Sequence, residues 1–214
     1  MDKLAAYYAQ RAAEYERIYA RPERQADLAA LRSRIGRLFA GRKVLELACG
    51  TGYWTDVIAP LAAELTALDV NEEVLAIARS KANVAKVEFL RASAYDLPDL
   101  GRRHDGLFAG FWWSHVPLAR LDGFLEAAVR SAAPGAMIAF LDNLYVEGSS
   151  TPLSRRDAEG NSYQDRGLDD GSRHEVLKNF PAEGELIQRA SRYGWGANVD
   201  LFEHYWLLTF WAPK

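Results

Sequence analysis

The chain has 214 residues, of which 49% are hydrophobic and 26% are charged. This length suits a single α/β domain, which buries enough surface to hold a core without a disulfide or a structural metal. Its 26 basic and 29 acidic residues give a net charge of -3, so no general attraction to nucleic acid or to an anionic membrane is expected, and small molecules are the expected partners.

Two helical segments open the chain, at residues 4–20 and 23–39, with Arg21 and Pro22 between them. Apolar runs of strand length then alternate with helical patterns. This alternation predicts β-α-β units around a mainly parallel sheet with helices on both faces. We expect the two N-terminal helices to form a cap, residues 1–40, over the open face of that sheet.

Seven strands are predicted, which makes the fold class α/β. Five of them are expected at residues 43–47, 65–68, 87–91, 105–111 and 137–141. The last two, near residues 199–201 and 205–212, are joined by a connection too short for a crossover helix. We therefore expect these two strands to form an antiparallel hairpin at one edge of the sheet.

The first predicted strand leads into a glycine turn, in the sequence VLELACGTG of residues 44–52. Small residues in such a turn let a ligand approach the backbone, and the following helix presents free N–H groups at its start. That helix is expected to end near Ala59 because Pro60 follows. The pattern predicts a site for a nucleoside cofactor; the alternative is a tight turn that binds no ligand.

The second predicted strand ends at Asp69, seventeen positions after Gly52. In a β-α-β unit this position lies beside the glycine turn, where a carboxylate accepts hydrogen bonds from both hydroxyls of a ribose. An aspartate at a strand end is also typical of a helix cap, and Asn71 qualifies for that role as well. The glycine turn at the right spacing favours the ribose interpretation.

The turn resembles the first motif of the class I S-adenosylmethionine-dependent methyltransferases, acidic-x-Gly-x-Gly-x-Gly, with Ala48 at the first glycine. Alanine is small, so we expect this departure to be mild unless the position needs a positive φ. The resemblance covers about residues 7–141 and implies a Rossmann-like fold with S-adenosylmethionine as the cofactor. It assigns cofactor binding to Glu46, Ala48, Cys49, Gly50, Gly52, Asp69 and Val70.

The resemblance implies further cofactor contacts. FLRASAYDLP is similar to the family's Gly-Asp-Ala-x-x-Leu-Pro, which implies that Ser93 and Ala94 lie against the adenine. Aromatic faces attract a sulfonium cation. The family's N-terminal tyrosines close over the methionine end, and the resemblance extends this role to Tyr15 and Tyr19 in AAEYERIY. Trp54, just after the turn, is suited to enclose the ligand, and Phe111 is also expected to bind the cofactor. The alternative for these aromatic residues is ordinary packing between helix and sheet.

The fourth predicted strand ends in GFWWSHVP, and α/β enzymes place substrates at the ends of parallel strands. Phe111, Trp112 and Trp113 predict flat apolar walls, and hence an aromatic or heterocyclic acceptor methylated on oxygen or nitrogen. His115 is the candidate catalytic base, with His174 as a second candidate. The alternative is that His115 only holds its loop by hydrogen bonding.

Residues 147–173 are rich in glycine, serine and charged residues, and are predicted to be a flexible lid or substrate loop. A guanidinium of this loop is suited to clamp an acidic group of the substrate, although so mixed a set of charges is also typical of a solvated face. The candidates are Arg155, Arg156, Arg166 and Arg173. Asp142 and Asn143 resemble two ligands of the magnesium-dependent catechol enzymes, but the third ligand is absent, so we expect no metal.

Two other functions are considered. A nicotinamide-dependent oxidoreductase would have Gly-x-Gly-x-x-Gly and Tyr-x-x-x-Lys, which the sequence lacks, and a non-catalytic module that binds S-adenosylmethionine would need no acceptor pocket. We therefore expect one methyltransferase domain, residues 1–214, acting as a monomer or homodimer. Cys49 is the only cysteine, and the sequence shows neither a leader segment nor an apolar run of about 18 residues, so a cytoplasmic location away from membranes is expected.

Overall fold

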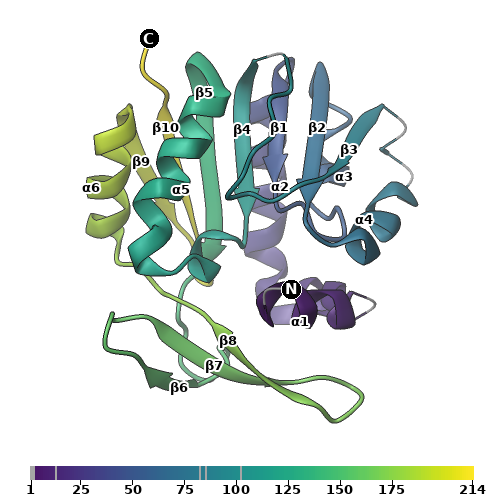
Figure 1. Ribbon diagram of the computed structural model, residues 1–214, viewed down its shortest axis with the longest axis vertical. Helices are drawn as coiled ribbons and strands as arrows, with labels where there is room; N and C mark the ends of the chain where they lie inside the picture. Colours follow the sequence, from purple (N-terminus) through teal and green to yellow (C-terminus); the bar gives the residue numbers. More distant parts are fainter. Residues whose placement is uncertain (1–2, 13, 82, 85, 102) are drawn as a thin grey trace.

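The computed structural model describes residues 1–214 except 1–2, 13, 82, 85 and 102. Its centre is a seven-stranded sheet of order β3-β2-β1-β4-β5-β10-β9 (Figure 1). The strands are β1 (Lys43–Leu47), β2 (Glu64–Asp69), β3 (Val87–Arg91), β4 (His104–Gly110), β5 (Ala132–Asn143), β9 (Trp195–Leu201) and β10 (Tyr205–Trp211). The first five pair in parallel and β10 pairs antiparallel with both β5 and β9, which confirms the predicted Rossmann-like sheet and its C-terminal hairpin.

The strands alternate between two apolar layers because successive side chains point to opposite faces. On β1, Leu45 and Leu47 join the core beneath α5 (Leu118–Ser131) and α6 (Glu183–Tyr193), whereas Val44 joins the core beneath α2 (Gln25–Phe39). The short helices α3 (Thr55–Ile58) and α4 (Glu72–Arg79) follow β1 and β2. Helices therefore cover both faces, as predicted.

The first helical segment differs from the prediction. A single helix was expected over residues 4–20, but α1 (Lys3–Arg11) ends early and Tyr15–Ala20 forms a 3-10 helix, η1. Tertiary contacts override the local propensity here, because η1 turns the Tyr19 ring into the core, where that residue is 8% exposed. Figure 1 places α1 at the lower edge of the sheet, beside α4 and β8, and not over an open face.

The second segment also begins differently, with the 3-10 turn η2 (Pro22–Arg24) before α2. The helix α2 lies on the sheet face as predicted, burying Leu28, Leu31 and Phe39 against it. The helix after the glycine turn ends at Ile58, also as expected.

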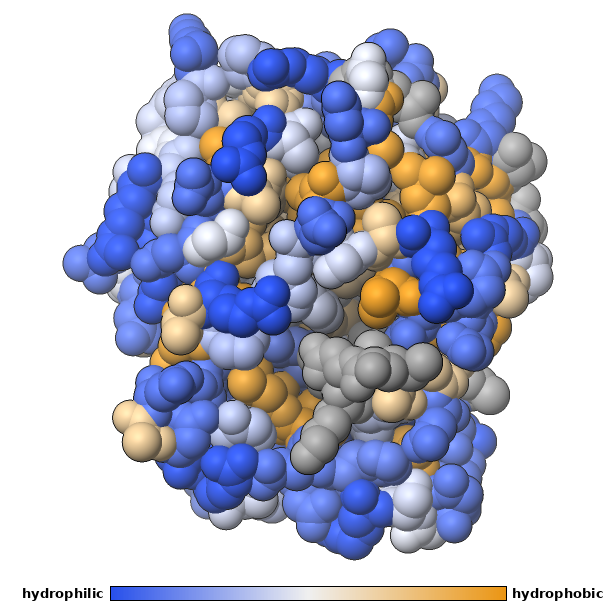
Figure 2. Space-filling view, viewed as in Figure 1, coloured by the Kyte–Doolittle hydropathy of each residue, from blue (hydrophilic) through white to orange (hydrophobic). Residues whose placement is uncertain are grey.

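The predicted flexible loop is wrong. Residues 147–173 contain two strands, β6 (Leu153–Arg156) and β7 (Ser162–Gly167), which form a second, three-stranded antiparallel sheet with β8 (Arg173–Leu177). Ion pairs across the strands, Arg155 with Glu175 and Arg173 with Asp165, replace the apolar alternation that would have indicated strands. The surface over this small sheet is largely hydrophilic on the face seen in Figure 2.

No helix within the described part of the chain has the length and apolar character needed to cross a membrane.

Candidate active site

The glycine turn lies at the carboxyl edge of the sheet, between β1 and α3. Gly50 has φ +55°, and a Cβ built on it would meet nothing within 4 Å. Gly52 has φ +78°, and its Cβ would come within 2.9 Å of the Ala78 Cβ on α4. The turn therefore leaves open space on one side while it packs tightly against α4 on the other, as the sequence pattern requires for close approach of a ligand.

Ala48 is the exception in this turn. Its φ is +51°, which is the case in which alanine was expected not to be a mild departure at this position. The left-handed conformation brings an alanine Cβ close to the following carbonyl and costs about 1–2 kcal/mol. Ala48 and Phe111, at +60°, are the two non-glycine residues with positive φ among those described, and both line the same cavity. Backbone strain of this kind gathers at functional sites.

Substitution of glycine for Ala48 is expected to raise the free energy of unfolding by about 0.5–1 kcal/mol, because the relief of strain exceeds the entropy that glycine adds to the unfolded chain. Urea denaturation would measure the change. Ala30, exposed in the middle of α2, provides the matched control, since Ala30→Gly is expected to destabilise by about 1 kcal/mol. Equal destabilisation by both substitutions would contradict the strain at Ala48.

Asp69 ends β2 beside the glycine turn, where the sequence places it. Its Oδ2 accepts the Gly50 N–H at 3.0 Å, and its Oδ1 accepts the Asn71 N–H at 2.9 Å. A carboxylate has about four acceptor positions, so these bonds leave capacity for a ligand. The helix α4 starts after Asn71, but the Asn71 side chain makes no capping hydrogen bond. Burial raises the pKa of Asp69 above its ordinary value.

A cavity of about 270 Å³ opens in front of the turn, and we call it the cofactor cavity. Six residues of the predicted cofactor site line it: Ala48, Gly50, Asp69, Val70, Ser93 and Phe111. Val70 is a large apolar residue left 43% exposed there, which leaves a flat apolar wall for a ring. Residues that the sequence did not assign to a cofactor complete the wall: Tyr8, Thr51, Asn71, Glu73, Val74, Arg91, Tyr95, Gly110, Trp112 and His115.

Several predicted cofactor residues lie behind the wall. The Cys49 side chain packs with Ala67 and Leu75, and Ala94 is buried in the main core. Trp54 is 3% exposed and fills the space beside Gly110, where a Cβ would come within 2.8 Å of the indole. These side chains therefore shape the cavity from behind.

Tyr19 is placed differently from the prediction. Tyr19 stacks on Tyr53 with the ring centroids 3.6 Å apart, so it packs between helix and turn and does not line the cofactor cavity. The side chain of Tyr15 lies outside the described residues. Tyr8, on α1, is the tyrosine of this segment that reaches the cavity among the described side chains.

Glu46 is also hidden behind the turn. It is 1% exposed, and its Oε2 accepts the Thr55 hydroxyl at 2.7 Å. Burial, with a smaller contribution from the charge of Asp69, raises the pKa of Glu46 to about 8. The side chain is therefore protonated at neutral pH and holds the first turn of α3 to β1.

This protonation predicts a pH effect on stability. The folded state retains the Glu46 proton while the unfolded chain releases it near pH 4.3, so this stabilisation is complete below about pH 4 and is lost as the pH rises to 8. Glutamine at this position keeps the neutral form at every pH. As the pH rises from 5 to 9, we expect the free energy of unfolding of Glu46→Gln to increase by at least about 2 kcal/mol relative to that of wild type, since one pKa unit corresponds to about 1.4 kcal/mol. The free energy of unfolding of each protein is measured by urea denaturation at several pH values. A difference between the two proteins that stays constant from about pH 5 to about pH 9 would contradict the prediction.

A second cavity, of about 250 Å³, lies between α1, the end of β5 and the β6–β8 sheet. We call it the cationic cavity because five basic side chains line it: Arg11, Arg21, Arg24, Arg166 and Lys178. Tyr8, Phe111 and His115 line both this cavity and the cofactor cavity. These three residues therefore mark the place where ligands of the two cavities would meet.

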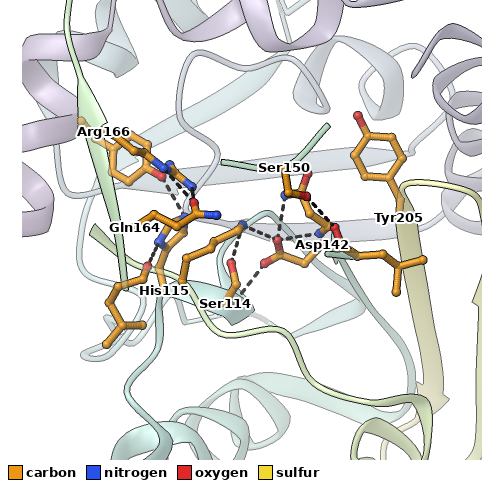
Figure 3. Close-up of polar contacts among 12 residues, drawn as sticks. Ser114, His115, Asp142, Ser150, Gln164, Arg166 and Tyr205 are labelled. Atoms are coloured by element: carbon orange, nitrogen blue, oxygen red, sulfur yellow. Dashed lines mark hydrogen bonds and ion pairs between the residues drawn. The ribbon is translucent and has the colours of Figure 1, made fainter. Parts of the chain in front are cut away.

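Lys178 is the most buried cation of this wall, with 3% exposure. Its Nζ donates to Asp142 Oδ1 at 2.7 Å and to Ser114 Oγ at 2.6 Å (Figure 3). Burial lowers the pKa of Lys178 to about 8, although Asp142 opposes the shift. Burial alone would raise the pKa of Asp142, yet the charge and hydrogen bond of Lys178 lower it. The pair is ionised at neutral pH.

His115 is held by two hydrogen bonds. Nδ1 lies 2.7 Å from the carbonyl oxygen of Leu177, which only accepts, so Nδ1 carries the proton. Nε2 then accepts the Tyr8 hydroxyl, 2.8 Å away. Burial, and next the charges of Lys178 and Arg166, lower the pKa of His115 well below its ordinary value. The imidazole is neutral and its lone pair is engaged, which is the geometry of a residue that orients Tyr8.

The other residues predicted to bind the acceptor lie in different parts of the structure. Trp113 is 2% exposed and packs on Phe140 and Trp206, so it belongs to the core and not to a substrate wall. Trp112 faces the cofactor cavity. His174 hydrogen-bonds Ser172 at 2.8 Å and is not among the residues lining the cationic cavity.

Of the four lid arginines, Arg166 lines the cationic cavity. Its Nε and Nη2 donate to Gln164 Oε1 at 3.1 and 2.6 Å. Arg155 and Arg173 pair with carboxylates on the surface, and Arg156 is exposed. Tyr8, Arg24 and Lys178 were not predicted from the sequence. For Lys178, the available signal was a lysine that lies between the apolar residues Leu177 and Phe180.

A family model described as a methyltransferase domain matches residues 44–135. Over 104 residues the chain is 32% identical to a fatty-acid O-methyltransferase of Mycolicibacterium smegmatis, a match that covers 48% of this chain and 37% of that protein. A demethylmenaquinone methyltransferase of Staphylococcus aureus is 29% identical over 106 residues, covering 48% and 43%. The chain thus spans less than half the length of these curated relatives.

A solved structure covers far more of the chain. The DhpI-SAM-HEP complex superimposes with a TM-score of 0.80 at 32% sequence identity, covering 97% of this chain and 95% of that one. The similarity therefore includes the β6–β8 region, which lies beyond the match to the family model.

Proposed function

This chain belongs to the class I S-adenosylmethionine-dependent methyltransferases, and we propose that it transfers the methyl group to an anionic oxygen of a small acidic acceptor. The observation that carries the proposal is the meeting of two cavities at Tyr8, Phe111 and His115, with buried cations on the side away from the glycine turn. The chain's division into a cap, residues 1–40, and a lid, residues 147–173, on one methyltransferase domain belongs to the same proposal.

The cofactor cavity fits S-adenosylmethionine. Asp69 presents a carboxylate with free acceptor positions for ribose hydroxyls, Gly50 leaves the backbone bare, and Val70 offers an apolar wall for the adenine. When bound, the cofactor supplies a methyl group on a sulfonium cation. The rings of Tyr8 and Phe111 lie where the two cavities join and are suited to face that cation.

The cationic cavity selects the acceptor. Lys178 and Arg166 would bind and orient an oxyanion, and the same charges disfavour a protonated amine. A carboxylate or phosphate is already ionised at neutral pH, so its oxygen needs no base, in keeping with a neutral His115 that positions the Tyr8 hydroxyl. An aromatic acceptor is less well supported, because Trp113, one of the three predicted apolar walls, lies in the core.

Methyl-labelled S-adenosylmethionine and a matched set of probes test the proposal: propionate, propyl phosphate, propylphosphonate, propylamine and phenol. We expect methyl ester formation with at least one acid and none with the amine or the phenol. Calorimetric titration of each probe into protein saturated with S-adenosylhomocysteine provides a second readout. Preferential binding or methylation of the amine or the phenol would overturn the proposal.

A further inference from the structure

Arg24 lines the cationic cavity without a charged partner. Its Nη1 donates to Asn143 Oδ1 at 3.0 Å and lies 3.4 Å from the Tyr205 hydroxyl, and its Nη2 donates to Ser149 Oγ at 3.1 Å. The guanidinium also lies over the Tyr205 ring, 5.5 Å from its centroid. Each of these partners is uncharged.

The burial of Arg24 makes this environment unusual. The residue is 8% exposed, and its Nε is buried with no hydrogen-bond partner. Within the part of the chain that the structure describes, no carboxylate lies within ion-pair distance of it, whereas the neighbouring Arg21 pairs with Glu23 at 3.8 Å. The Glu23 carboxylate acts on Arg24 from farther away, and it accepts the Ser149 hydroxyl at 3.4 Å. A buried cation without a close counter-charge is unfavourable, and an anion in the cavity would complete the site.

Arg24 and Arg166 approach the cavity from opposite sides. In Figure 3, Arg166 and Gln164 lie on one side of Asp142, and Tyr205 lies on the other. Arg24 is on the Tyr205 side because it contacts the Tyr205 hydroxyl and Asn143, at the end of β5. The cavity therefore has two cationic ends, with Arg166 at one and Arg24 at the other.

We propose that Arg24 is a second anion-binding site and that the acceptor is a bifunctional acid. One oxyanion is methylated at the Lys178 and Arg166 end, and a second anionic group pairs with the guanidinium of Arg24, whose Nη2 has a second N–H beyond the one donated to Ser149. This inference rests on the proposed function, which requires one anionic group alone.

Acids matched in chain length test the inference: butyrate against succinate, and pentanoate against glutarate. Each is titrated into protein saturated with S-adenosylhomocysteine, and each is assayed for methyl transfer. We expect one dicarboxylate to bind at least about tenfold more tightly than its monocarboxylate counterpart, the effect of one added charge-assisted contact. Arg24→Gln should remove that preference, so that the ratio of the dicarboxylate affinity to the monocarboxylate affinity falls to about one.

Two further variants serve as a conservative substitution and as a control. Arg24→Lys retains the charge but not the planar guanidinium, so part of the preference should persist even if Arg24→Gln folds poorly. Arg34→Gln, a matched change on α2 at an exposed pair with Asp200, should preserve the preference fully. Equal binding of mono- and dicarboxylates to wild type, or equal weakening of both by Arg24→Gln, would overturn the inference and leave the proposed function standing. If no acid of either kind binds or is methylated, the proposed function itself fails.

Discussion

Replacement of Lys178 by methionine is expected to lower kcat/KM for an acidic acceptor by about 10- to 100-fold, since a hydrogen bond to a charged group contributes about 1.5–3 kcal/mol. It is also expected to lower the free energy of unfolding by about 3–5 kcal/mol, because the fully buried Asp142 carboxylate loses the cation that compensates its charge. Methyl-transfer kinetics and urea denaturation measure the two effects.

The two effects are separable. In the double variant Lys178→Met with Asp142→Asn, neither of the two positions carries a charge, so most of the stability should return while the activity stays low. Recovery of activity together with stability would show that Lys178 only supports the fold. A kcat/KM equal to wild type in the single variant would contradict its assignment to the acceptor.

The pH dependence gives a further readout of the same group. Wild-type kcat/KM for an acid should fall as the pH rises through about 8, because Lys178 loses its charge there. The charge of Asp142 raises the pKa of Lys178, so Asp142→Asn alone should shift this fall to lower pH. Stability follows the opposite trend. Between about pH 8 and about pH 10.4, the folded protein has released the Lys178 proton while the unfolded chain still binds it, so the contribution of Lys178 to the free energy of unfolding increases with pH.

The strands of the main sheet were predictable because their signal is local. The bounds expected for β1 and β3 agree with the structure, since apolar runs of strand length are bounded by turn residues. The strands β6–β8 carry no such signal. Their register is set by backbone pairing with β7, and exposed ion pairs such as Arg155 with Glu175 join residues twenty positions apart in a polar sequence.

The cofactor cavity and the cationic cavity also differ in how far the sequence predicts them. Gly50 and Asp69 belong to one β-α-β unit, so the sequence places them side by side, as the structure does. The Tyr8–His115 contact joins residues 107 positions apart, and Arg24 meets Tyr205 across 181. Such contacts depend on how α1, η2 and the small sheet close over the carboxyl edge, which no local pattern indicates.

The backbone conformation of two site residues could not be predicted from the sequence either. Ala48 and Phe111 both adopt positive φ, although neither residue type favours it. Phe111 is held by its N–H, which donates to the Leu141 carbonyl at 2.7 Å. Its ring thereby reaches the junction of the two cavities, a position that periodicity along β4 does not predict.

Substitution of alanine for Asp69 is expected to weaken S-adenosylmethionine binding by at least about tenfold, since the ribose loses a charged acceptor. The unfolding free energy should fall by about 1–3 kcal/mol as well, because the Gly50 and Asn71 N–H groups lose their partner. Asp69→Asn should bind nearly as weakly, because its amide has one oxygen for two N–H donors and would turn its own NH₂ towards the other. Calorimetric titration measures the affinities.

Asp105 supplies the control for a purely structural effect. Its exposed carboxylate accepts the Lys43 N–H at 2.7 Å, at the opposite end of β1, so Asp105→Ala should cost some stability without changing cofactor affinity. S-adenosylmethionine and S-adenosylhomocysteine share the ribose and differ at the sulfur. A ribose contact therefore predicts that Asp69→Ala weakens both by the same factor, whereas a loss confined to S-adenosylmethionine would place Asp69 at the sulfonium. Wild-type affinity for both ligands would remove Asp69 from the cofactor site.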